Sequence, residues 1–148
     1  MAMNANQAIH ELNKLIDACW IGVESSTAAG EEAHDIGLRS LMTGYVIQRS
    51  DFAAVLQAEV TRLDGSDALA GAAWRQHSLA DATGKAPRRD DATILAECEL
   101  GVEATMDAYR GALRHADLPF RLRAIIHRQF QRIELSRAGM AQLRQRHA

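Results

Sequence analysis

Three glutamates lie close together in the segment 94–109, which reads ILAECELGVEATMDAY: Glu97, Glu99 and Glu103. Carboxylates on helices are the ligands of di-iron and di-manganese centres in helical bundles. Such a centre needs about four Glu and two His that point inward, with Glu-x-x-His pairs from two helices. A centre of this kind would make the protein an oxidase or an iron-handling protein. The direction in which the helix points these acids therefore decides whether they can be ligands.

The angular position of the three acids argues against a metal site. At about 100° per residue, the apolar stripe of this helix centres on Cys98 and Val102. Glu99 falls about 80 to 90° from that centre, and Glu97 and Glu103 fall further away. We expect all three side chains at the flank of the helix or toward solvent, and no metal centre.

The remaining candidates for chemistry are equally unpromising. One Glu-x-x-His pair, Glu31 and His34, lies at an expected hairpin turn and in the first turn of the second helix, where the helix dipole favours acids. Cys19 and Cys98 stand in apolar helical patterns that are typical of reduced, buried thiols. The other histidines lack the spacing with an acid or cysteine that zinc needs. They are His10, His77, His115, His127 and His147. With no glycine-rich elbow or phosphate loop either, we expect no catalytic residue, no metal ligand and no cofactor.

Four long amphipathic segments must position these residues. Apolar side chains recur at spacings of three and four in each segment, which indicates helices. The first helix should run over about 4–28 and stop at Gly30, and the second should end at 64–67. The fourth should begin with Asp117 as its N-cap and Pro119 in its first turn. The expected inner faces carry, in chain order, Ile9, Leu12, Ile16, Cys19, Val23; Leu38, Leu41, Tyr45, Phe52, Leu56, Val60, Leu63; Ile94, Cys98, Val102, Thr105, Tyr109, Ala112; Leu122, Ile126, Gln129, Ile133, Met140 and Leu143.

Connection lengths predict the topology. About five residues join the first helix to the second and the third to the fourth, so each pair should be an antiparallel hairpin. About 24 residues, 65–88, separate the hairpins and contain a weak helical pattern at about 69–79. A connection of this size can return along a helix of about 37 Å, which makes the second and third helices parallel. We expect a single all-α domain over 1–148, a ferritin-like four-helix bundle with up-down-down-up topology and a long crossover containing a short helix.

Motifs from all four segments also occur in a characteristic order. They are Leu15-Ile16, Cys19, Gly22, Glu24, Arg49, Phe52, Leu56, Ile94-Leu95, Cys98-Glu99, Gly101, Tyr109, Leu118-Pro119, Gln129 and Ile133. Together they resemble a bacterial family of small ferritin-like four-helix-bundle proteins that is catalogued as a domain of unknown function. The resemblance implies an acid where this chain has Val23 and Val102, and a histidine where it has Arg137. Valine donates nothing to a metal and arginine repels one, so this departure again favours a bundle without metal.

A polar set remains at or near the seam of the bundle. Its predicted members are Tyr45, Gln48, Arg49, Glu59, Glu99, Tyr109, Gln129 and Arg137, together with Thr105 and Ser136. Burial of an unpaired arginine is costly. We therefore expect Arg49 and Arg137 to reach water or to pair with an acid, the candidates being Glu24, Glu59, Glu99 and Glu134. Two interpretations stay open: a hydrogen-bond network that fixes helix register, and a small anion or metabolite pocket left where a metal used to be.

Composition excludes further classes. A net charge of -2, with 24% charged and 47% hydrophobic residues, is typical of a soluble globular protein and gives no bulk attraction to nucleic acid. No apolar run approaches the roughly 18 residues that span a bilayer, and the first ten residues lack the order of a signal peptide. Hence we expect a cytoplasmic protein, outside the membrane and without nucleic acid.

Charge is nevertheless uneven along the chain. Residues 121–147 hold seven arginines against Glu134 alone, whereas the first helix and its turn are acidic. Attraction between oppositely charged neighbouring helices explains this pattern, and a basic stripe that meets RNA or DNA is the alternative. Trp20 and Trp74 either cover the seams between helices or anchor a partner chain or a second copy.

These observations predict a non-catalytic bundle protein of bacterial type. We expect an interaction or stress-related accessory protein that lacks the di-metal centre and acts with a protein partner or as a homo-oligomer. The stress label comes from the family resemblance alone. The alternatives are a ferritin-like di-metal oxidase or iron-handling protein, and a nucleic-acid-associated protein that uses the basic last helix.

Overall fold

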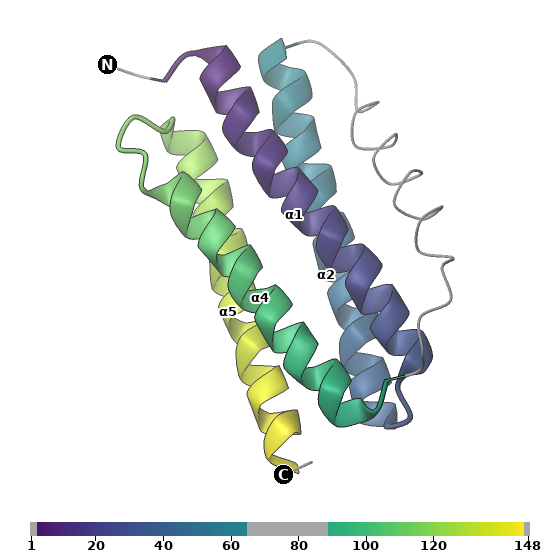
Figure 1. The fold of residues 1–148 in the computed structure, drawn as a ribbon. Helices are drawn as coiled ribbons and strands as arrows, with labels where there is room; N and C mark the ends of the chain where they lie inside the picture. The colour runs from purple at the N-terminus through teal and green to yellow at the C-terminus, as the bar shows by residue number, and fades with distance from the viewer. Residues whose placement is uncertain (1–2, 65–88, 147–148) are drawn as a thin grey trace.

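Four helices form the protein in a computed structural model that describes residues 3–64 and 89–146. They are α1 (Ala5–Glu32), α2 (Ile36–Asp64), α4 (Asp91–Leu113) and α5 (Phe120–Arg146). All four lie side by side as a bundle (Figure 1). The predicted all-α class is confirmed. The short helix expected at about 69–79, with Trp74 and His77, lies outside the described residues.

The topology is up-down-down-up. Helix α1 packs against α2 and α4, and α5 packs against α4 and α2. At one end of the bundle, the first turn of α4 meets the α1–α2 hairpin: Asp91 accepts hydrogen bonds of 2.9 Å from the backbone N–H groups of His34 and Asp35. At the other end, the N–H of Met3 donates to the carbonyl of Asp117 at 3.1 Å. Helices α2 and α4 therefore run parallel, as the connection lengths predicted (Figure 1).

Helix α1 begins where its capping residues allow and extends further than expected. Asn4 and Gln7 form a capping box, in which each side chain accepts from the other's backbone N–H. The helix continues through Gly30, the predicted stop, and ends at Glu32. Gly30 serves the packing of α2 instead, because a Cβ at this position would lie 3.3 Å from the Cβ of Met42.

Helix α5 starts two residues later than predicted. The carbonyl of Pro119 accepts the first helical hydrogen bond, from the N–H of Arg123 at 2.9 Å. Pro119 thus occupies the N-cap position, and Asp117 lies two residues before it. Proline suits this place because its missing N–H has no partner to satisfy. The expected N-cap role of Asp117 is wrong.

The core is made of the predicted apolar faces. Leu12, Leu56, Ile94 and Ile126 are completely buried, one from each helix. Each such side chain contributes about 1.5–3 kcal/mol through burial, which is what holds the helices together. Over residues 3–64 and 89–146, none of the helices combines the length and the apolar character that crossing a membrane requires.

Candidate functional site

A buried arginine stands at the middle of the bundle. Arg49 of α2 is 3% exposed, and its guanidinium carbon lies 5.5 Å from the centre of the Tyr45 ring. Its Nη1 donates to the side-chain carbonyl of Gln48. Helix α1 leaves room for it at Gly22, where a Cβ would come within 3.3 Å of the Cγ of Arg49. The missing side chain of Gly22 therefore lets the arginine lie along α1.

The guanidinium borders a small internal chamber. This chamber has a volume of about 40 Å³ and is lined from all four helices. Ser26 of α1 and Thr105 of α4 contribute hydroxyl groups, and both residues are buried. Val102 of α4 and Met140 of α5 contribute apolar groups. The chamber therefore has both polar and apolar walls, and the Arg49 guanidinium is the cationic group among its lining residues.

No carboxylate in the described part of the chain pairs with Arg49. The titratable groups that act on it are Cys19, Tyr109 and Tyr45. Burial raises the pKa of Cys19 to about 11 and raises the pKa of both tyrosines well above their usual value. All three are neutral at pH 7, while Arg49 keeps its charge even though burial lowers its pKa. Of the two outcomes expected for Arg49, contact with water or pairing with an acid, pairing with an acid does not occur among the described residues.

A second polar network crosses the core beside Arg49. The Tyr109 hydroxyl donates to Gln129 Oε1 at 2.7 Å, so the Cys19 thiol, 3.4 Å away, is the donor to the Tyr109 oxygen. Gln129 Nε2 in turn donates to the carbonyl of Phe52 at 3.3 Å. The chain of hydrogen bonds takes one group from each helix and carries no charge. It holds the four helices in one register.

Three other residues of the predicted polar set lie near Arg49, where hydrogen bonds connect α2 to α5. The Tyr45 hydroxyl donates to the Ser136 carbonyl at 2.6 Å, and the Ser136 hydroxyl lies 3.2 Å from the Gln48 carbonyl oxygen. The structure therefore brings Tyr45, Gln48, Arg49 and Ser136 together.

The predicted charged members lie elsewhere. Glu59, 5% exposed, accepts from Arg121 at 2.8 Å near the end of the bundle where α2 stops and α5 begins. Arg137 is exposed and donates to Glu103 at 2.7 Å, which was not among its expected partners. Neither Glu59 nor Arg137 reaches the chamber.

The acids of α4 take the flanking positions that their angles predicted. Glu97 is exposed and bonded to Arg89, and Glu103 and Glu99 are partly exposed. Glu99 contacts Arg144 through one carboxyl oxygen, while its other oxygen, Oε1, is buried and has no hydrogen-bond partner among the described residues. Across the described residues, no three His, Cys, Asp or Glu side chains are grouped so that they could hold a metal ion.

The Glu-x-x-His pair also lies away from the core. Glu31 and His34 are both exposed. Glu31 stands in the last turn of α1, and α2 begins at Ile36. The expected place in the first turn of the second helix is therefore wrong, and the reason is that α1 continues past Gly30.

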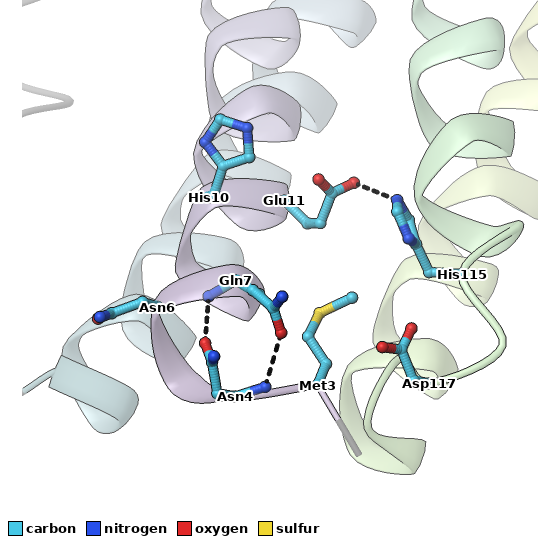
Figure 2. Close-up of a pocket in the computed structure, with 8 residues that line it drawn as sticks. All are labelled: Met3, Asn4, Asn6, Gln7, His10, Glu11, His115 and Asp117. Carbon is cyan, nitrogen blue, oxygen red and sulfur yellow. Dashed lines mark hydrogen bonds and ion pairs between the residues drawn. The ribbon is translucent and has the colours of Figure 1, made fainter. Parts of the chain in front are cut away.

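A buried acid that sequence reasoning missed lies at the end of the bundle. Glu11 of α1 is 6% exposed and bridges Lys14 Nζ at 2.8 Å and His115 Nε2 at 3.1 Å. Figure 2 shows Glu11 and His115 facing one another across a pocket of about 420 Å³, with the capping residues Asn4 and Gln7 on its wall. Glu11 and His115 are 104 positions apart, so only the topology brings them together. Their contact closes the end of the α1–α4 seam.

Comparison with known proteins identifies the fold. No family model matches the chain, and no curated protein does. A similar solved structure is the 1.90 Å crystal structure of a two-domain protein from Anabaena variabilis ATCC 29413 that contains DJ-1/ThiJ/PfpI-like and ferritin-like domains. The match has a TM-score of 0.89 at 12% identity and covers 99% of this chain. The chain spans 41% of the length of that protein.

The chain has a ferritin-like fold. The TM-score and the four-helix architecture both support this statement, which confirms the predicted fold class. Resemblance to one particular family within the fold stays a prediction, because no family model bears it out.

We expect substitution of Gly22 to reveal the close contact with Arg49. Replacement of a mid-helix glycine by alanine favours a helix by roughly 0.5–1 kcal/mol. Gly44→Ala should show this gain, since Gly44 lies inside α2 and a Cβ there meets nothing within 4 Å. Gly22→Ala should show a smaller gain or a loss, because its Cβ presses on Arg49. Urea unfolding of both variants measures the difference, and equal gains would contradict the contact.

We expect Glu59 to make the stability depend on pH. Hydrogen bonding from Arg121 holds the pKa of the Glu59 carboxyl below its ordinary value of 4.5, despite burial that raises it. Its stabilising effect is therefore complete above that value and is lost as the pH falls through the lower, folded-state pKa. Glu59→Gln should flatten the fall of Tm in this acid range. Glu134→Gln, at an exposed glutamate of α5, is the control and should keep the wild-type slope.

Proposed function

We propose that this protein is a non-catalytic member of the ferritin-like fold that lacks the di-metal centre and acts as an interaction or accessory protein. The observation that supports this most is the buried charge of Arg49 at the middle of the bundle. A dinuclear metal centre places two cations inside a bundle and neutralises them with carboxylates. Here a fixed cation occupies the interior, and no carboxylate of residues 3–64 and 89–146 accompanies it.

The donor groups in the core also suit hydrogen bonding better than metal binding. Hard cations take carboxylate oxygens, whereas the core offers a thiol, a phenol and an amide in Cys19, Tyr109 and Gln129. Metal binding by cysteine needs the thiolate, and the raised pKa of Cys19, about 11, keeps it a thiol at neutral pH. Val102 is buried where the family resemblance implies an acid.

An interaction role is supported by the surface and by the similar structure. Large apolar side chains are exposed on several helices, among them Leu100 at 73% and Leu135 at 73%. In the two-domain protein from Anabaena variabilis, a ferritin-like domain and a second domain share one chain. A bundle that works beside a partner domain, or beside a second copy, is the corresponding role for this chain. We place it in the cytoplasm because its two cysteines, Cys19 and Cys98, are free thiols.

The nucleic-acid alternative is not favoured by the contacts of α5. Arg121, Arg137 and Arg144 are paired with Glu59, Glu103 and Glu99. The side chain of Arg123 donates to backbone carbonyls in the α4–α5 connection. Four of the seven arginines are thus engaged within the bundle, which supports charge neutralisation between helices.

Metal analysis tests the absence of the di-metal centre. Protein purified without chelators, and then incubated with Fe(II) or Mn(II) and desalted, should hold far less than one transition ion per chain by mass spectrometry. The reason is the Arg49 charge, together with the lack of convergent carboxylates in the described part of the chain.

A second variant distinguishes a metal site in the bundle interior from one at the flank of α4. Glu99→Gln replaces the carboxylate by a neutral amide, so metal that is bound by the wild type and not by this variant is held at the flank of α4. Two transition ions per chain that persist in Glu99→Gln would overturn the proposal and favour a ferritin-like oxidase or iron-handling protein.

A further inference from the structure

We propose that the chamber beside Arg49 binds a small monovalent anion of the size of chloride, bromide or nitrate. The inference goes beyond an accessory role, although it rests on the same absence of a metal pair. It follows from the charge of Arg49, from its N–H groups without a described partner, from the volume of the chamber and from the groove that leads to it.

The charge of Arg49 has no counter-ion in the described part of the chain. A guanidinium stays protonated in proteins, and Arg49 is 3% exposed. The groups that act on it electrostatically are a thiol and two phenols, all neutral at pH 7. The Tyr45 ring offers its π-face at 5.5 Å, which offsets only part of the cost of burying a charge. A small anion from solvent supplies the missing charge.

Unused hydrogen-bond donors face the same space. Arg49 carries five N–H groups in a fixed plane, and among the described residues only its Nη1 has a hydrogen-bond partner, the Gln48 carbonyl. The N–H groups of Nε and Nη2 therefore remain to donate. Ser26, 7% exposed, lines the chamber, and its hydroxyl makes no hydrogen bond with the described residues. A planar guanidinium and one hydroxyl form a suitable cradle for an anion.

The size of the chamber limits what enters. A volume of about 40 Å³ corresponds to about three water-sized spheres, because one water needs roughly 10–15 Å³ by this measure. A monatomic anion or a small planar anion fits this space. The apolar lining from Val102 and Met140 replaces none of the lost hydration, which disfavours strongly hydrated phosphate and sulfate.

A groove between α1 and α4 leads to the chamber. The groove, about 670 Å³ in volume, and the chamber share Ile21, Ser25, Cys98 and Gly101 in their walls. The outer part of the groove carries acidic side chains, and Arg89 is the basic residue on its wall. These acids are Glu24, Glu31, Glu32 and Glu97. Acids at the entrance oppose a multivalent anion more than a monovalent one.

Bromide can be located directly. Crystals of the full chain soaked in sodium bromide should show an anomalous-scattering peak within hydrogen-bond distance of Nε or Nη2 of Arg49. Bromide carries the charge of chloride and has an anomalous signal that identifies it. A map with no peak at Arg49 would overturn the proposal, whatever peaks lie on the surface.

Thermal unfolding in solution gives an independent measurement. Sodium bromide replaces sodium gluconate at constant ionic strength, since gluconate is too large for the chamber. The wild-type Tm should rise by roughly 5–10 °C when bromide reaches a hundredfold excess over its Kd, as expected for a ligand that binds only the folded state. Arg49→Met should show no rise.

Arg137→Met is the matched control, because it removes an exposed guanidinium and should respond as the wild type does. An equal response of the wild type and Arg49→Met, or no response of the wild type, would contradict the site. If Arg49→Met does not fold, the bromide map decides. If the protein binds neither metal nor bromide, the anion site is refuted and the proposed function stands. If it binds two metal ions per chain, the proposed function is refuted.

Discussion

The burial of one arginine charge determines how the interior of this bundle is organised. Arg49 lies between α1 and α2 because Gly22 leaves space beside it and Tyr45 places a ring over it. The titratable groups of the described residues that act on it are neutral, since burial keeps Cys19 and Tyr109 protonated. A cation in this position repels further cations. The ferritin-like fold is therefore present here with an interior suited to a negative ligand.

Charged pairs hold the ends and seams, while neutral hydrogen bonds hold the centre. Pairs that join different helices lie at the bundle ends or in solvent-facing seams: Glu59 with Arg121, Glu103 with Arg137, Glu99 with Arg144. The arginine of each pair is largely exposed to solvent, so the pair contributes modestly. The network of Cys19, Tyr109, Gln129 and the Phe52 carbonyl is dry and uncharged. This division lets one cation, Arg49, stand alone at the centre.

Sequence patterns predicted the architecture because helical periodicity and connection length act locally. The flanking position of Glu97, Glu99 and Glu103 followed from angles along a single helix. The pairing of Glu11 with His115 did not follow, because it depends on how α1 and α4 are placed. Nor did the isolation of Arg49, since a partner acid was expected on general energetic grounds. Departures from a local energetic rule are frequent at functional sites, which is why Arg49 is the best candidate in this chain.

The most direct test is the free energy of unfolding of Arg49→Met, measured by urea titration in gluconate buffer without small anions. A buried charge without a partner makes this variant at least as stable as the wild type, because an apolar side chain of similar length replaces a costly cation. A loss of about 3 kcal/mol or more would show that the wild-type guanidinium has a buried counter-charge, and would contradict the interior described for this bundle.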